Sequence, residues 1–90
     1  MNKSTSKTSP SYLLQLARRE GAHITKVLVT SNQDLIARGE RLTPSQLSDL
    51  TDITIANLKT KKLLPAHLGG ERLGAFIKPF QDEIIKAGLF

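Results

Sequence analysis

The side chains between Thr54 and Arg72 are the ones in this chain best suited to contact another molecule chemically. Lys59, Lys61 and Lys62 place three positive charges within four residues, among amide and hydroxyl side chains. An asparagine can pair with adenine through two hydrogen bonds, a lysine can reach the acceptors of guanine, and methyl groups can contact thymine. The segment therefore predicts contacts with base edges and phosphates. The candidate residues are Thr54, Ile55, Asn57, Lys59, Thr60, Lys61, Lys62, His67 and Arg72.

These candidates divide into two roles. Asn57, Lys59 and the methyl groups of Thr54 and Ile55 suit base contacts, whereas Lys61 and Lys62 suit phosphates. His67 is either a further phosphate contact or an exposed loop residue. The competing interpretation is a solvated helix face that happens to be basic, which is what a charge run usually signifies.

Two short helices are expected to position the set. Thr43 predicts an N-cap, Pro44 fits the first helical position, and Gln46 stands three residues after Thr43 to complete a capping box. Thr51 and Asp52 interrupt the apolar pattern and predict a turn. A second helix is then expected from about residue 55 to residue 62, with Leu58 facing inward, and Pro65 forbids its continuation.

A hairpin is expected after the second helix, because Gly69 and Gly70 permit the positive φ values of a two-residue turn. Helix, turn, basic helix and hairpin wing together resemble the winged helix-turn-helix of the MerR and excisionase group. The resemblance covers about a third of the chain. Its matching residues are Leu47, Ile53, Ile55, Leu58, the exit from Lys62 to Pro65, and the Gly-Gly wing that ends in Arg72.

The resemblance implies a mainly α fold, a small winged helix-turn-helix domain with a short β-hairpin wing. It implies sequence-specific binding of double-stranded DNA, as in small transcriptional regulators, excisionase-type recombination factors or replication initiators of phages and other mobile elements. The chain departs from the group by having Asp52 where the group usually places glycine. It also lacks the aromatic pair and the long dimerising helix of MerR proteins, so metal or drug sensing is not implied, and a homodimer is left open.

Charge and length agree with a small nucleic-acid binder. Ninety residues suffice for one domain, and the net charge is +5. Residues 1–19 contain four positive and no negative side chains, and residues 54–72 contain four positive and one negative. We expect residues 1–10 to form a flexible basic arm and residues 11–90 to form the domain. The arm either reaches into a minor groove or is an ordinary frayed end.

The remaining elements are predicted as helices. One begins at Pro10 or Ser11 and stops at Gly21, and residues 23–29 fit either a strand or a helix, with the helix preferred. Ser31 or Asn32 caps a short helix through Arg38, which buries Leu35 and Ile36 and ends at Gly39. Pro79 starts a last helix that ends at Gly88. Phe76, Phe80 and Phe90 are expected in the core.

Composition argues against several other classes. The chain has no cysteine, and its two histidines, His23 and His67, stand far apart with no carboxylate motif, so we expect no enzyme, metal or cofactor. No purely apolar aliphatic run is longer than the three residues of Val27–Val29, too short for a membrane span. We therefore expect a cytoplasmic protein, nucleoid-associated when bound to DNA. The alternative function is a helical interaction module whose basic face meets an acidic protein partner.

Overall fold

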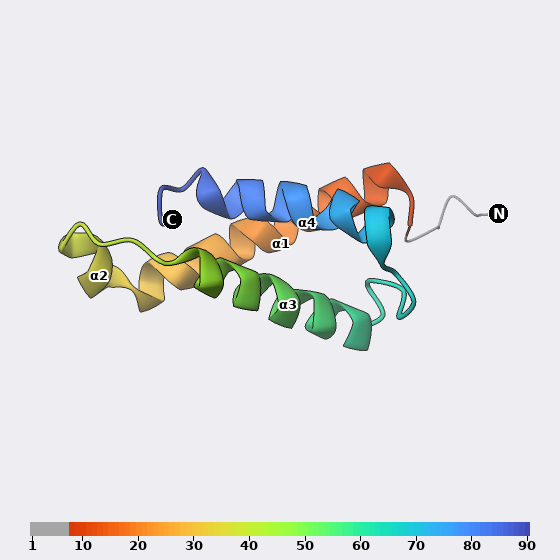
Figure 1. Ribbon diagram of the computed structural model, residues 1–90, viewed down its shortest axis with the longest axis horizontal. Coiled ribbons are helices and arrows are strands. Elements are labelled where there is room, and N and C mark those ends of the chain that lie inside the picture. The colour runs from red at the N-terminus through yellow and green to blue at the C-terminus, as the bar shows by residue number, and fades with distance from the viewer. Residues whose placement is uncertain (1–7) are drawn as a thin grey trace.

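The computed structural model describes residues 8–90, and in that range the chain forms four helices. They are α1 (Pro10–Ser31), α2 (Gln33–Ala37), α3 (Pro44–Thr60) and α4 (Gly70–Ile85). α1 and α4 pack together and run in the same direction, whereas α3 runs in the opposite direction (Figure 1). The described part of the chain is elongated, with principal-axis extents of 52 × 21 × 19 Å.

The expected winged helix-turn-helix fold is wrong, because no residue between 8 and 90 belongs to a β-strand. Gly69 and Gly70 do not form a hairpin turn but begin α4, with Gly69 as the extended N-cap and Gly70 at a φ of 61°. The chain from Leu73 onward repeats apolar residues at helical spacing, and burying them on one face favours a helix. That burial outweighs the turn preference of the two glycines.

Pro79 lies inside α4 and not at the start of a helix, which corrects a second expectation. Proline has no backbone N–H, so α4 lacks one hydrogen bond at this position. Phe76 and Phe80 stand on either side of it with 0% exposure, and their rings stack with centroids 5.4 Å apart. Burying a phenylalanine contributes about 1.5–3 kcal/mol, so the pair offsets the lost hydrogen bond and keeps the helix continuous.

α1 also passes through the position where it was expected to stop. Ser9 caps it by accepting a hydrogen bond from the Tyr12 backbone N–H at 3.2 Å, and it starts at Pro10 as predicted. Gly21 is buried in the middle of α1, where a Cβ would stand 2.7 Å from Glu83 Cβ and 3.0 Å from the Phe80 carbonyl oxygen. Glycine is therefore needed for close packing against α4. The preference for helix over strand at residues 23–29 is confirmed.

α3 joins the two short helices of the expected helix-turn-helix into one. Its N-terminus is confirmed, because Thr43 and Gln46 form the predicted capping box, with the Thr43 N–H 2.7 Å from Gln46 Oε1. The predicted turn at Thr51 and Asp52 is wrong. The Thr51 hydroxyl donates to the Leu47 carbonyl at 2.8 Å, as a helical threonine can, and accepts from Gln81 Nε2 of α4 at 3.0 Å. Thr51 is thus part of the buried face of α3, whereas Asp52 is helical but exposed.

α2 follows α1 after the single residue Asn32. Asn32 stands at the N-cap as one of the two predicted caps, but its amide donates to the Leu28 carbonyl at 2.9 Å and makes no cap hydrogen bond. Leu35 is half-buried, while Ile36 is exposed, contrary to expectation. Gly39 and Gly88 take positive φ values of 74° and 81° where the short and the last helix were expected to end.

The core lies mainly between α1 and α4, and α3 and the chain end close it. The Leu42 N–H donates to the Leu89 carbonyl at 2.7 Å, which joins the segment before α3 to the last residues. Among the residues described, no helix combines the length and apolarity that crossing a membrane requires. The buried apolar residues are Leu13, Leu16, Ala17, Leu28, Leu42, Ile55, Leu58, Leu64, Leu68, Phe76, Phe80, Ile84 and Leu89.

Candidate functional site

Exposed cations gather where α3 ends and α4 begins. Lys61, Lys62, His67 and Arg72 are all exposed there, and we call these four residues the basic end. α1 begins at the same end of the molecule (Figure 1). Lys3 and Lys7, the cations of the expected arm, lie outside the described residues. The basic end therefore combines two helix boundaries and the loop between them.

The exit of α3 holds Lys62 in an unusual conformation. The Lys62 N–H donates to the Lys59 carbonyl at 3.0 Å and the Leu63 N–H to the Leu58 carbonyl at 2.9 Å, which is the Schellman pattern of a helix C-terminus. Lys62 has a φ of 64°, in the left-handed region that glycine usually occupies at this position. The chain thus has a lysine at a position where the backbone conformation favours glycine.

Two side chains fix the loop beyond that exit. The Tyr12 hydroxyl of α1 donates to the Leu63 carbonyl at 2.6 Å, and Lys59 Nζ donates to the Leu68 carbonyl at 2.9 Å. Leu64 and Leu68 are buried beneath the loop, with 1% and 4% exposure. The loop is consequently anchored at both ends, so the cations on it project from a fixed backbone.

The predicted base-reading surface does not form. Thr54 and Ile55 are only 6% and 8% exposed and face the core, so the expectation that they face outward is wrong. They are buried because α3 is continuous and places both on the stripe that contains Thr51 and Leu58. Lys59 is half-buried, and its ammonium is occupied by the Leu68 carbonyl.

Asn57 and Thr60 are exposed on α3, but on its outer side, away from that buried stripe. The Thr60 hydroxyl donates to the Ala56 carbonyl at 2.9 Å. The structure therefore brings Lys61, Lys62, His67 and Arg72 to one end, and it leaves Asn57 and Thr60 beside the helix that leads there.

Charge is separated along the stretch from α3 to α4. Between Ile53 and Gln81 the one carboxylate is Glu71, against five cationic side chains. The first half of α3 instead carries Asp49 and Asp52, both exposed. An α3 laid lengthwise along a phosphate backbone would bring these two carboxylates against it, so a polyanion is better approached by the basic end alone.

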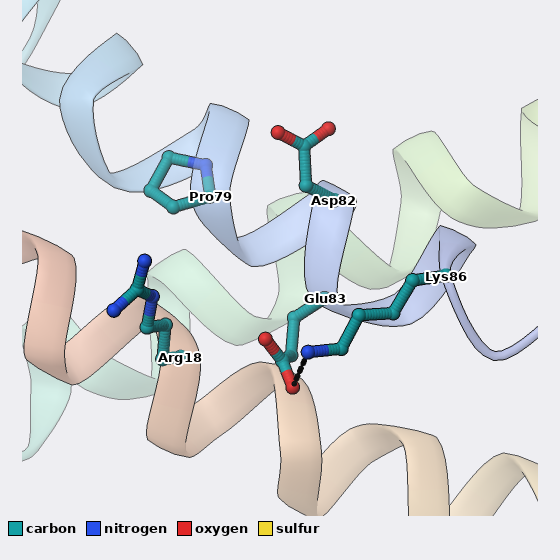
Figure 2. Close-up of a pocket in the computed structure, with 5 residues that line it drawn as sticks. All are labelled: Arg18, Pro79, Asp82, Glu83 and Lys86. Atoms are coloured by element: carbon teal, nitrogen blue, oxygen red, sulfur yellow. Dashed lines mark ion pairs between the residues drawn. The ribbon is translucent and has the colours of Figure 1, made fainter.

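A second polar feature is the open cleft between α1 and α4, which sequence reasoning did not identify. It is lined by Arg18, Pro79, Asp82, Glu83 and Lys86, and Arg18 points from α1 toward Pro79 (Figure 2). Lys86 Nζ lies 3.0 Å from Glu83 Oε2. Two cations and two carboxylates line this cleft, so its charges balance and favour neither an anion nor a cation. No local pattern in the sequence places residue 18 beside residue 79.

Comparisons of the chain with protein-family models, with curated proteins and with solved structures yield no match. Function is therefore inferred from the geometry and charge of the described residues.

Proposed function

We propose that this protein binds the phosphate backbone of duplex DNA through its basic end. The observation that carries the proposal is the exposure of Lys61, Lys62 and Arg72 on a loop and helix boundary anchored by the Tyr12 and Lys59 hydrogen bonds. Fixed cations contribute to phosphate binding mainly by releasing condensed counterions, so the affinity should depend steeply on salt.

The contacts proposed here position the protein on DNA more than they read its sequence. With Thr54 and Ile55 in the core, Asn57 is the exposed side chain of the predicted set best suited to pairing with a base. A few phosphate contacts made end-on supply an affinity that differs little between sequences. We therefore expect a small ratio of specific to non-specific affinity.

The test measures the salt dependence of binding to an end-labelled duplex of random sequence by fluorescence anisotropy. The variant Lys61→Ala/Arg72→Ala should lower the slope of log K against log salt by about two units, one for each lost phosphate contact. Affinity should fall by about tenfold per contact at about 0.1 M salt. Lys62→Gly should lower the slope by about one unit while suiting the positive φ at this position.

Lys26→Ala is the matched control for Lys62→Gly, because Lys26 is exposed on the second half of α1 and each of the two substitutions removes one positive charge. It should leave the slope unchanged, and an equal effect of Lys26→Ala would show that net charge alone determines binding.

Poly-glutamate of the same charge as the duplex distinguishes DNA from an acidic protein as the partner. If it binds as tightly as DNA, the acidic-protein alternative is favoured.

A further inference from the structure

α3 presents a second surface, on the side opposite its buried stripe. Ile53, at its centre, is 58% exposed, the highest value among the large apolar side chains of the described residues. We call this surface the outer stripe of α3. It consists of Gln46, Asp49, Leu50, Ile53, Ala56, Asn57 and Thr60, which recur at helical spacing on one side of the helix.

An apolar groove lies beside the first half of this stripe. One side of it is lined by Leu28 of α1, by Asn32 and by Leu42, and the other by Gln46, Asp49, Leu50 and Ile53 of α3. The exposed Ile53 and the adjoining groove thus form one continuous partly apolar surface.

We propose that a second copy of this chain packs here, with the outer stripes of the two α3 helices antiparallel about a two-fold axis at Ile53. In this register each position of the stripe meets one of like polarity. Ile53 meets Ile53 of the second copy, Leu50 meets Ala56, Asp49 meets Asn57, and Gln46 meets Thr60. Such an isologous contact closes on itself, so it yields a dimer and not a larger assembly.

The chemistry of the polar positions supports this register. Neither the Asp49 carboxylate nor the Asn57 amide has a side-chain partner within residues 8–90. Across the two-fold axis the amide N–H groups of Asn57 can donate to the Asp49 carboxylate, once on each side of Ile53. A parallel arrangement would instead place Asp49 against Asp49, which like charge disfavours.

The proposed interface is small, and its size limits the affinity expected for the dimer. Residues 46 to 60 span about 21 Å at about 1.5 Å per residue, the length of a single helix face. Stable dimers usually bury about 800 Å² on each partner, so one helix face supports a weak dimer with a Kd above about 1 μM. Lys61 and Lys62 lie beyond the paired residues, so this inference does not rest on the proposed function.

Disulfide cross-linking tests the register, because the chain contains no cysteine. Antiparallel helices about 8–10 Å apart bring facing Cα atoms to roughly 4–5 Å, within disulfide reach. Ile53→Cys should therefore oxidise quickly to a covalent dimer. Asn57→Cys, four residues from the axis, would face its own copy at about 12 Å along the helix, too far for a disulfide.

Mixing Asp49→Cys with Asn57→Cys chains should yield mainly the mixed disulfide, which mass spectrometry resolves. Ile85→Cys, at an exposed position of α4, is the control for random collision. Far-ultraviolet circular dichroism checks that each reduced variant keeps the wild-type helix content. Oxidation of Ile53→Cys no faster than Ile85→Cys would overturn the proposal, as would efficient cross-linking of Asn57→Cys alone.

Sedimentation equilibrium provides an independent measurement on the unmodified protein. The average mass should rise from the monomer value of 9.9 kDa toward twice that value as concentration increases. Ile53→Asp should keep the mass at the monomer value, since it places two carboxylates on the axis. A wild-type mass that stays at 9.9 kDa through millimolar concentrations would show that no such dimer forms.

Discussion

Gly21 shows how a single residue determines the packing of two helices. Helix interiors disfavour glycine by about 0.5–1 kcal/mol relative to alanine, so its presence in the middle of α1 calls for a packing reason. The reason is the approach of α4, whose Phe80 carbonyl oxygen would stand 3.0 Å from a Cβ at this position. Backbone cannot move aside as a flexible side chain can.

Replacing Gly21 tests this explanation. Gly21→Ala should lower the free energy of unfolding by about 1–3 kcal/mol, because the added methyl group overpacks the contact between α1 and α4. Gly74→Ala is the control within α4, since no atom lies within 4 Å of a Cβ there. It should raise stability by about 0.5–1 kcal/mol. Urea denaturation followed by circular dichroism measures both, and a stabilised Gly21→Ala protein would contradict the close contact.

At the scale of elements, α3 is the helix whose continuity decides what the protein presents to a partner. Its buried stripe includes Thr51, Thr54, Ile55 and Leu58, and the two threonines have low intrinsic helix propensity. Packing against the rest of the molecule outweighs that propensity, as it does for most helices in proteins. The same continuity removes Thr54 and Ile55 from the surface and creates the outer stripe.

Substitutions of Asp52 can distinguish a continuous α3 from two helices joined by a turn. It is exposed near the middle of α3, so its substitution acts mainly through backbone preference. Asp52→Ala should be more stable than Asp52→Gly by about 1 kcal/mol, the usual difference between these residues in a helix interior. A left-handed turn residue would reverse this order, because glycine adopts that conformation without cost. Thermal or urea unfolding of the two variants provides the comparison.

At the scale of the whole molecule, buried side chains are distributed unevenly between the two ends. The basic end lies where α1 and α4 begin, and the opposite end consists of the last turns of α1, α2 and the segment that leads to α3 (Figure 1). α2 has no buried residue, whereas α4 buries Phe76, Phe80 and Ile84. Stability is therefore unevenly distributed along the long axis.

Hydrogen exchange should reveal this gradient. Backbone amides in the middle of α4 and around Ala17 in α1 should exchange only through global unfolding, because they adjoin fully buried side chains. Amides of α2 should exchange through local opening, many times faster at the same pH. Native-state exchange followed by NMR or mass spectrometry measures the two groups, and equal protection of α2 and α4 would contradict the gradient.

Features that depend on neighbouring residues followed from the sequence alone. The capping box of Thr43 and Gln46, the helix start at Pro10 and the positive φ of Gly39 and Gly88 each rest on contacts within a few residues. The burial of Phe76 and Phe80 also followed, since large apolar side chains gain most from leaving water. Lys61, Lys62 and Arg72 were predicted as contact residues, which requires exposure, and all three are exposed.

Only the tertiary structure decided the features that join distant segments. Gly21 and Pro79 are helix breakers in isolation, yet both lie inside helices because α1 and α4 bury their faces against each other. Thr51 and Asp52 become helical because the Thr51 face meets Gln81 of α4. The Tyr12 hydroxyl fixes the loop at Leu63, 51 residues away, through a contact that no local pattern encodes. Intrinsic preferences of about 1 kcal/mol per residue decide a helix boundary only where no larger burial opposes them.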